Sequence, residues 1–388
     1  MILGVPKETV SEERRVALVP ELVPRLIHAA LDVAVESGAG AESGFPDLEY
    51  AQKGARLESE VFAHADILLK VRPPGVDEIM RLKESSTYIG FLEPIAGSPQ
   101  IRLLGERKIT AFAMELMPRI ARAQAMDALS AMSTVAGYKA VVLAANRLPR
   151  FFPLLMTAAG TITPARVFVI GAGVAGLEAI GTARRLGAVV EAYDTRPAVK
   201  EVVESVGARF VELDLDTKDA EVKGGYAKDM GSAFYVQQQE MMSQHVIAAD
   251  VVIAAALVRG QRAPILITEE MIRKMRPGSI IVDLAAEQGG NCALTEPGRE
   301  ATKHGVTILG PVNLPSTMPY PASQMYARTV TAFLMHLLKE GRIHLDLDDE
   351  LIRSTLVTHQ GKIVNESVKA ALSSEPLVGE KANELAGQ

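Results

Sequence analysis

Short apolar runs alternate with longer stretches of helical spacing along most of the chain. In the first third, the strand-like runs are Ile2–Val5, Val33–Val35, Ile67–Val71, Tyr88–Leu92 and Ile109–Leu116. The stretches between them have the mixed polar and apolar spacing of helices, at Glu21–Ala30, Tyr50–Gly54, Asp77–Lys83 and Gln100–Arg107. Because strand and helix alternate, crossover connections and a parallel sheet are expected.

A second alternating unit begins at Arg166. Its strand-like runs are Val167–Ile170, Val189–Tyr193, Val251–Leu257, Ile280–Leu284 and Val306–Leu309. Two long helical patterns, Ala121–Asn146 and Gln324–Lys339, flank this unit, and the tail has one strand-like run at Ser354–Val357. The pattern predicts an α/β protein of two Rossmann-like, doubly wound parallel-sheet domains. Residues 1–126 and 313–388 are expected to form the first domain, and residues 127–312 the second.

Composition and charge narrow the function classes. The chain has 388 residues, 48% hydrophobic and 23% charged, enough for two ordinary globular cores. Its formal net charge of -6 argues against a nucleic-acid partner. The single cysteine, Cys292, excludes an internal disulfide, and no cluster of Cys or His at ligand spacing predicts a metal site. The N-terminus becomes charged at once, unlike a secretory signal, and the apolar runs are too short to span a bilayer.

The strongest motif follows the first strand of the second unit. Gly171, Gly173 and Gly176 fit the G-x-G-x-x-G fingerprint, in which the glycines allow a tight turn, close approach to a pyrophosphate and close helix packing. Asp194 ends the next strand, where a carboxylate accepts hydrogen bonds from ribose hydroxyls and repels a 2′-phosphate. The motif therefore predicts NAD(H) rather than NADP(H). Arg196 could meet a 2′-phosphate, but is expected to flank the adenine.

A second polar segment precedes the long helical pattern. Arg119, Gln124, Asp127 and Ser130 interrupt an apolar stretch, and the last three follow one another at intervals of three, which places them on one helix face. From the residues alone, a helix N-terminus with a cap and surface charges explains them equally well.

Sequence segments along nearly the whole chain resemble the NAD(H)-binding subunit of proton-translocating nicotinamide nucleotide transhydrogenase. These segments are Val5–Glu8, Arg14–Pro20, Arg122–Asp127, Gly171–Gly176, Gly224–Met230 and Asp283–Cys292. The resemblance implies that Arg119, Gln124, Asp127 and Ser130 lie beside the nicotinamide and its ribose. It implies that the rest of the dinucleotide is lined by Val174, Asp194, Arg196, Gly225, Gln238, Ala256 and Leu257. It also implies an NAD cleft between the two domains, with the first domain forming the facing wall.

A glycine-rich loop, Lys223–Gly231, precedes the helical run that starts at Ser232. Its glycines suit a hinged lid in which Tyr226 and Met230 close over a ligand. An ordinary surface loop is the alternative, and the resemblance favours the lid.

The resemblance implies direct hydride transfer from NADH to NADP⁺ held on a partner domain, coupled to proton translocation. The expected partners are an NADP(H)-binding domain, a transmembrane proton-channel subunit and a second copy in a homodimer. The expected location is cytoplasmic, peripheral to the inner membrane through those subunits. A non-catalytic NAD-sensing module remains an alternative.

Alanine dehydrogenase shares the fold and the opening motif, and is the other enzyme alternative. Arg15 and Lys70 match the residues that contact its carboxylate substrate, but here they are expected to pair with nearby carboxylates. Phe91 stands where that enzyme has an acid–base histidine, and Glu287 stands where it has an aspartate. Because phenylalanine cannot move a proton, amino-acid oxidation is disfavoured.

Overall fold

The computed structural model describes residues 1–94, 99–213, 215, 221–222, 226–258 and 261–374. These residues divide into two compact units, which are described separately. Unit 1 comprises Met1–Ala131 and Met318–Gln388, and unit 2 comprises Met132–Thr317. The boundaries lie slightly after those expected at residues 126 and 312, because the segment before residue 131 packs with helix α10 of unit 1.

Unit 1 is built on one sheet with strand order β21-β20-β6-β5-β4-β1-β2-β3. The strands are β1 (Ile2–Val5), β2 (Asp32–Glu36), β3 (Arg56–Glu58), β4 (Ile67–Leu69), β5 (Thr87–Gly90), β6 (Thr110–Ala113), β20 (Leu356–His359) and β21 (Lys362–Ile363). From β3 to β6 all pairs are parallel and follow the doubly wound order. Strand β20 pairs antiparallel with β6, so the returning C-terminal segment extends the sheet.

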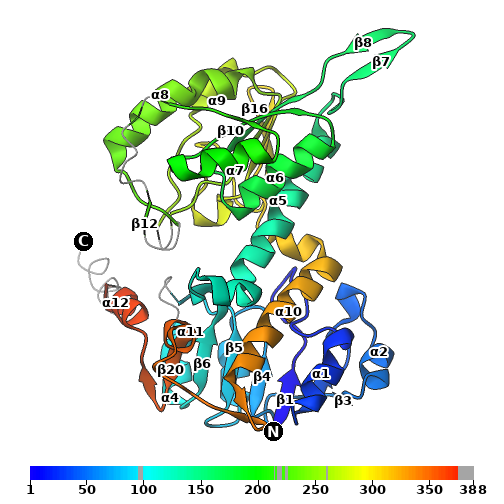
Figure 1. Cartoon of the computed structure of the whole chain (residues 1–388), viewed down its shortest axis with the longest axis vertical. Helices are drawn as coiled ribbons and strands as arrows, with labels where there is room; N and C mark the ends of the chain where they lie inside the picture. The colour runs from blue at the N-terminus through cyan, green and yellow to red at the C-terminus, as the bar shows by residue number, and fades with distance from the viewer. Residues whose placement is uncertain (95–98, 214, 216–220, 223–225, 259–260, 375–388) are drawn as a thin grey trace, which may run out of the picture. The chain divides into compact units, whose positions relative to one another are not determined.

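The helices of unit 1 follow the strands they connect (Figure 1). The α-helices are α1 (Val23–His28), α2 (Asp47–Gln52), α3 (Val76–Arg81), α4 (Pro99–Glu106), α10 (Pro319–Leu337), α11 (Glu350–Thr355) and α12 (Glu366–Ser374). Short 3-10 helices occur at η1 (Pro20–Leu22), η2 (Ala41–Ser43), η4 (Met114–Leu116) and η5 (Ala121–Met126). A two-stranded ribbon, β18 (Leu338–Lys339) with β19 (Arg342–Ile343), follows α10.

Unit 2 has a seven-stranded sheet of order β11-β10-β9-β14-β15-β17-β16. The strands are β9 (Arg166–Ile170), β10 (Val189–Tyr193), β11 (Arg209–Phe210), β14 (Val251–Ala254), β15 (Ile280–Asp283), β16 (Glu300–Lys303) and β17 (Val306–Leu309). All pairs are parallel except β16 with β17. The sheet's helices are α5 (Ala128–Arg147), α6 (Val174–Arg185), η6 (Pro197–Val199), α7 (Lys200–Ser205), α8 (Ser232–Ala248), α9 (Glu269–Lys274), η7 (Ala286–Gln288) and η8 (Leu314–Thr317).

The expected α/β class and the two Rossmann-like sheets are confirmed, because buried apolar strands and crossover helices build both units. Two element predictions were wrong. The strand expected over Ile109–Leu116 ends at Ala113, where η4 begins. The helix expected over Ala121–Asn146 is interrupted at Asp127, which has non-helical backbone angles of φ -79° and ψ 87° between η5 and α5.

Helix α5 carries the chain from one unit into the other. It is the one helix among the described residues that is long and apolar enough to cross a membrane. However, Ala140, Val141 and Ala144 are at most 1% exposed and belong to the core of unit 2. This burial is typical of a core helix.

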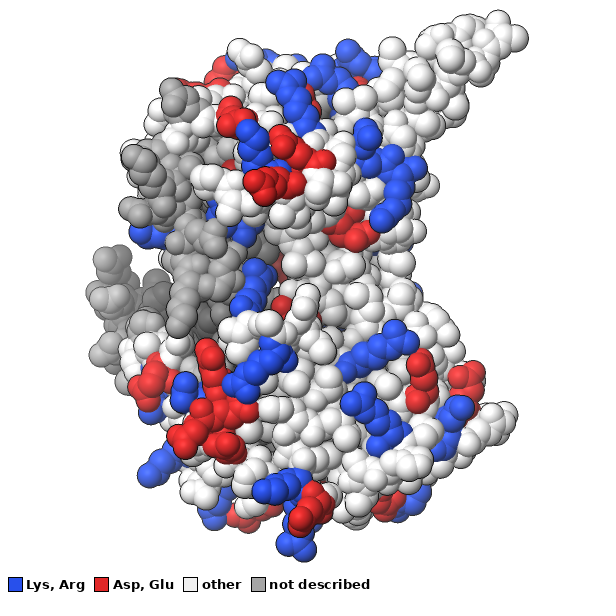
Figure 2. Space-filling model, in the orientation of Figure 1, with Lys and Arg blue, Asp and Glu red and all other residues white. Residues whose placement is uncertain are grey.

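A β-hairpin that the sequence did not predict projects from unit 2 (Figure 1). It consists of β7 (Leu155–Thr157) and β8 (Gly160–Ile162), which pair only with each other among the described strands. Met156 is 76% exposed and Leu154 is 52% exposed. No Lys, Arg, Asp or Glu occurs between Arg150 and Arg166, and Figure 2 shows the projecting arm without charged side chains.

Candidate dinucleotide-binding site

The turn between β9 and α6 has the geometry that its glycines predict. Gly171 adopts a φ of +92°, and a Cβ there would lie 2.8 Å from the carbonyl oxygen of Ala255. A Cβ on Gly176 would lie 1.8 Å from the carbonyl oxygen of Gly171, so α6 packs directly on the turn. By contrast, no described atom lies within 4 Å of a Cβ placed on Gly173. That space admits a pyrophosphate beside the first turn of α6, whose amides have no acceptors within the helix.

Asp194 follows β10 and is tied to the glycine turn. Its Oδ2 accepts the backbone N–H of Ala172 at 2.7 Å. The carboxylate also forms a two-point ion pair with Arg196, with Nε to Oδ1 at 2.8 Å and Nη2 to Oδ2 at 2.7 Å. Both side chains are at most 10% exposed. The negative charge that would repel a 2′-phosphate is therefore balanced by an adjacent cation, which the sequence did not reveal.

Helix α8 places Gln238 in the interior of unit 2. Gln238 is 1% exposed, and its Oε1 has no hydrogen-bond partner among the described residues. A buried acceptor without a donor costs free energy, so this atom favours a polar ligand group. Together with the open space at Gly173, it indicates that the residues present fit a dinucleotide.

The loop before α8 is described only over some of its residues. Strand β13 (Tyr226–Ala227) pairs antiparallel with β12 (Glu221–Val222). Met230 is half-buried and its N–H lies 3.5 Å from the hydroxyl of Tyr235. Gly225, predicted to contact the dinucleotide, lies outside the described residues. The lid function stays a prediction.

The segment after β14 forms one wall of the glycine turn. Besides the contact with Ala255, a Cβ on Gly171 would lie 3.0 Å from the backbone nitrogen of Ala256. Leu257 follows and is 43% exposed. The structure therefore brings Ala256 next to the fingerprint glycines, as expected for a residue that lines the dinucleotide. Val174, the first residue of α6, is half-buried in the same turn.

The segment predicted to face the nicotinamide lies in and beside η5 of unit 1. Asp127 caps α5, since its Oδ1 accepts the N–H of Ser130 at 2.9 Å and its Oδ2 accepts the Ser130 hydroxyl at 2.5 Å. The cap interpretation therefore holds for these two residues. Gln124 and Arg119 have exposed side chains. Their role beside the nicotinamide stays a prediction.

A polar network that the sequence did not predict holds η5 in unit 1. The guanidinium of Arg122 donates to Asp349 with Nη2 to Oδ1 at 2.7 Å. His336 Nε2 lies 2.7 Å from Asp349 Oδ2, and Asp349 Oδ1 accepts the N–H of Leu351 at 2.9 Å. One carboxylate thus joins η5, the end of α10 and the start of α11.

The cations that resemble substrate contacts of alanine dehydrogenase are paired internally. Arg15 donates to both carboxylate oxygens of Glu13, at 2.7 and 2.6 Å. The ammonium of Lys70, fully buried, donates to Glu8 Oε2 at 2.6 Å and lies 3.5 Å from Glu78. The expected pairing with nearby carboxylates is confirmed.

The two remaining positions of that comparison are also occupied by internal contacts. The ring of Phe91 packs against Tyr326 with centroids 5.3 Å apart. Glu287 accepts the N–H of Asn313 with its Oε1 at 2.6 Å. Neither arrangement provides a histidine-like acid–base group.

Glu115 lies at the carboxyl end of the unit 1 sheet. Its Oε1 accepts the N–H groups of Leu92 and Glu93 at 2.8 and 2.5 Å, and its Oε2 is shielded from solvent. Burial raises the pKa of Glu115 to about 7, and the backbone hydrogen bonds offset only some of that effect. The carboxyl group therefore titrates near neutral pH.

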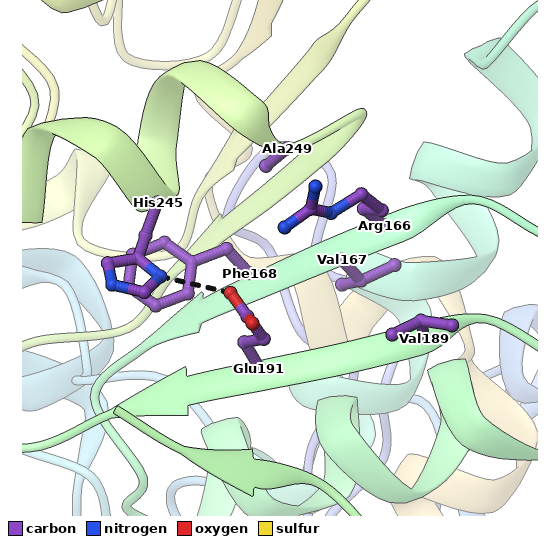
Figure 3. Close-up of a pocket in the computed structure, with 7 residues that line it drawn as sticks. All are labelled: Arg166, Val167, Phe168, Val189, Glu191, His245 and Ala249. Carbon is purple, nitrogen blue, oxygen red and sulfur yellow. Dashed lines mark hydrogen bonds and ion pairs between the residues drawn. The ribbon is translucent and has the colours of Figure 1, made fainter. Parts of the chain in front are cut away.

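A small hollow in unit 2 lies towards the amino-terminal ends of β9 and β10 (Figure 3). There His245 Nδ1 lies 3.0 Å from Glu191 Oε2, and its ring stacks on Phe168 with centroids 5.5 Å apart. Ligands of doubly wound sheets bind at the carboxyl ends of the strands. The hollow is therefore at the wrong edge of the sheet for the dinucleotide.

Comparison with known proteins agrees with this site. Residues 4–136 match the family model of the alanine dehydrogenase/PNT N-terminal domain, and residues 140–366 match that of the C-terminal domain. The chain is 46% identical over 376 residues to an NAD(P) transhydrogenase alpha subunit of Rhodospirillum rubrum, an alignment that covers 94% of this chain and 98% of the relative.

Solved structures and more distant relatives give the same order of similarity. A transhydrogenase structure from Sinorhizobium meliloti has a TM-score of 0.85 and 42% identity, covering 94% of this chain and 100% of that one. An alanine dehydrogenase of Halomonas elongata is 31% identical over 385 residues, covering 97% of this chain and 98% of the relative. The chain is therefore more similar to these transhydrogenase subunits than to that alanine dehydrogenase.

Proposed function

Because this chain belongs to the alanine dehydrogenase/PNT family, we propose that it is the NAD(H)-binding component of an NAD(P) transhydrogenase. The observation that carries the proposal is the turn at Gly171, Gly173 and Gly176, with Asp194 hydrogen-bonded to its backbone. Unit 1 has a doubly wound sheet without such a fingerprint, so one dinucleotide per chain is expected. The second nucleotide, NADP(H), is assigned to a partner domain.

The chemistry proposed is direct hydride exchange between the two nucleotides. Bound NADH supplies the hydride, and the chain's own residues bind and orient it. Gly173 and the start of α6 hold the pyrophosphate, Asp194 and Gln238 hold the adenosine half, and Gln124 with Asp127 orients the nicotinamide end. Hydride exchange between aligned rings needs positioning rather than an acid or base, which agrees with Phe91 in the place of a histidine.

The proposed partners follow from the same assignment. They are an NADP(H)-binding domain and a transmembrane proton-channel subunit, through which the chain is peripheral to the cytoplasmic side of the inner membrane. Coupling of hydride transfer to proton translocation belongs to that larger assembly. Two of the relatives are named as alpha subunits of a transhydrogenase, which supports partner subunits.

A homodimer is proposed from the projecting hairpin. A two-stranded hairpin is marginally stable alone in water, and this one exposes Met156, Leu154 and Ile162 without charged residues. Its open strand edges are self-complementary under a two-fold axis, because antiparallel strands can pair edge to edge. A second copy of this chain is therefore the partner that fits the arm.

The test is single-turnover exchange between NADPH and an NAD⁺ analogue, with and without the purified NADP(H)-binding partner. The expected result is exchange only when both proteins are present. Binding of NADH without exchange in the presence of the loaded partner would instead support the NAD-sensing alternative. Failure to bind NADH at all would refute the assignment of the glycine turn.

A further inference from the structure

The chain leaves the unit 2 sheet at Ala256, and one side chain takes over the role of the sheet there. Asn291 Oδ1 accepts the N–H of Ala256 at 3.0 Å. The Nδ2 of the same amide donates to the carbonyl oxygen of Ala256 at 2.9 Å. One primary amide thus pairs with both backbone groups of a single residue, as a neighbouring strand would.

Asn291 is itself held on every side. It is fully buried, and its Nδ2 also donates to the carbonyl oxygen of Pro264 at 2.9 Å. Its backbone N–H donates to Oδ2 of Asp283, which ends β15, at 2.8 Å. The preceding Gly290 has a φ of +79°, and a Cβ there would lie 2.8 Å from Asp283 Oδ2. The amide therefore has little freedom to shift.

The held peptide borders the dinucleotide turn directly. The backbone nitrogen of Ala256 lies 3.0 Å from the Cβ position of Gly171. Because interiors are closely packed, a displacement of the Ala256 peptide is transmitted to the glycine turn and to Leu257. The contacts run from Asp283 through Asn291 and Ala256 to Gly171.

We infer that Asn291 is a positioning residue of the dinucleotide site, acting through the Ala256 peptide without contacting the nucleotide. The inference rests on the proposed function, in which this site binds NAD(H). It assigns a role to the Gly290-Asn291 step beyond helping the chain to turn. Asn291 fixes the wall against which the fingerprint glycines pack.

Two substitutions separate this role from general stability. In Asn291→Asp the shape is kept, but an ionised carboxylate cannot donate to the carbonyl oxygens of Ala256 and Pro264. In Asn291→Ser the side chain is too short to reach both groups, which leaves buried backbone groups unsatisfied without adding a charge. For both variants we expect the NADH dissociation constant to rise about tenfold or more.

The chain offers a matched control in unit 1. Asn365 Nδ2 donates to the carbonyl oxygen of Ser354 at 3.0 Å, and its Oδ1 accepts the N–H of Val368 at 3.3 Å. Asn365→Asp breaks the same kind of amide–backbone pairing, but away from the glycine turn. It should lower the melting temperature and leave the NADH dissociation constant unchanged.

The experiment is NADH fluorescence titration of the full chain, with thermal melts of each variant. A second readout is NAD⁺ binding as a function of pH, because the carboxyl group introduced by Asn291→Asp regains one donor when it is protonated. Asn291→Asp should therefore recover affinity on acidification, whereas Asn291→Ser should not. Wild-type affinity in both variants, with melting losses like those of Asn365→Asp, would overturn the inference. Wild-type protein that does not bind NADH contradicts the proposed function instead.

Discussion

Asp194 and Arg196 form a buried ion pair beside the glycine turn, so nucleotide choice depends on two charges rather than one. Asp194 Oδ2 also accepts the N–H of Ala172, which fixes the carboxylate relative to the turn. A 2′-phosphate would have to approach this carboxylate, whereas ribose hydroxyls can donate to it. Arg196 is held by the same carboxylate at 2.7–2.8 Å.

The Asp194→Ala variant tests this arrangement. Wild-type protein should bind NADH at least about tenfold more tightly than NADPH. Removing the carboxylate abolishes the repulsion and frees Arg196 to pair with the 2′-phosphate, so the difference should narrow. Fluorescence titration with both nucleotides measures it. In Asp194→Ala with Arg196→Ala, the NADPH gain that is due to arginine should disappear. Equal affinities of wild-type protein for the two nucleotides would contradict the assignment.

Glu115 makes the stability of unit 1 depend on pH. Burial raises its pKa from the ordinary value of 4.5 to about 7 in the folded protein. A carboxyl group with a raised folded pKa stabilises the protein below its unfolded pKa, and this stabilisation is lost as the pH rises through about 7. Its contribution is therefore largely present at about pH 5 and lost by about pH 8.

Replacing Glu115 with Gln should remove this dependence, because the amide oxygen still accepts the N–H groups of Leu92 and Glu93. At about pH 8 the Glu115→Gln variant should melt at a higher temperature than wild-type protein, with a stability gain of up to about 3 kcal/mol. The difference should close towards about pH 5. Glu106→Gln, at an exposed position of α4, is the control. Parallel melting curves for wild type and Glu115→Gln across this pH range would refute the assignment.

At the level of elements, the break between η5 and α5 decides where the polar residues of the nicotinamide segment lie. The carboxylate of Asp127 stops one helix and starts the next by capping it at Ser130. Gln124 lies one 3-10 turn earlier, and Arg122 anchors η5 to Asp349. The segment is therefore held at both ends while Gln124 remains exposed.

Gln124→Asn tests whether this exposed side chain orients the nicotinamide. Shortening it by one methylene moves the amide by about 1 Å, which can reduce the hydride-transfer rate on the order of 10²-fold. NADH affinity and melting temperature should change little, because the pyrophosphate and adenosine are held in unit 2. Stopped-flow transfer with the loaded partner, beside thermal melts, measures both. Gln52→Asn on α2 is the control. Reduced stability with an unchanged transfer rate would assign Gln124 to helix structure alone.

The β7–β8 hairpin is the element that predicts the oligomeric state. Wild-type protein should have about twice the mass of one 41.6 kDa chain by light scattering. Met156→Glu places a charge on the exposed apolar arm and should yield monomers, because burying an unpaired charge in an interface is costly. Leu48→Glu changes a residue that is 66% exposed on α2 and should leave the dimer intact. A dimeric Met156→Glu protein would contradict the role of the arm.

For the molecule as a whole, the internal pairing of Arg15 and Lys70 separates the two enzyme alternatives. With Phe91 in place of a histidine, no base is provided for amino-acid oxidation. Purified protein should therefore not reduce NAD⁺ with L-alanine, measured as NADH absorbance under conditions in which it binds NADH. Robust NADH production from alanine or another common L-amino acid would favour the dehydrogenase alternative.

The fold was predictable where buried strands are continuous apolar runs, as at Ile2–Val5 and Val189–Tyr193, which match β1 and β10. The prediction failed where a local side chain or a partner decides. Asp127 interrupts an otherwise helical pattern by capping α5. Strand β16 (Glu300–Lys303) is short and polar, and it forms only by pairing with β17.

The candidate site divides in the same way. The glycine turn and Asp194 were predictable because they are close in sequence and their chemistry requires fixed spacings. Asn291 was not, because its partner Ala256 lies 35 residues earlier and only the folded chain brings them together. The Arg196 pairing was also missed, since the same two residues could have pointed apart.

The insertion of unit 2 between the two segments of unit 1 sets an order for folding on the ribosome. All strands of the unit 2 sheet have been synthesised by Leu309, whereas the unit 1 sheet needs β20 and β21, which end at Ile363. The nascent chain therefore begins unit 1 first but can complete it only last. During that interval β6 exposes the edge that β20 later covers, so the emerging polypeptide passes through a stage at which chaperones or a neighbouring nascent chain can reach an open strand.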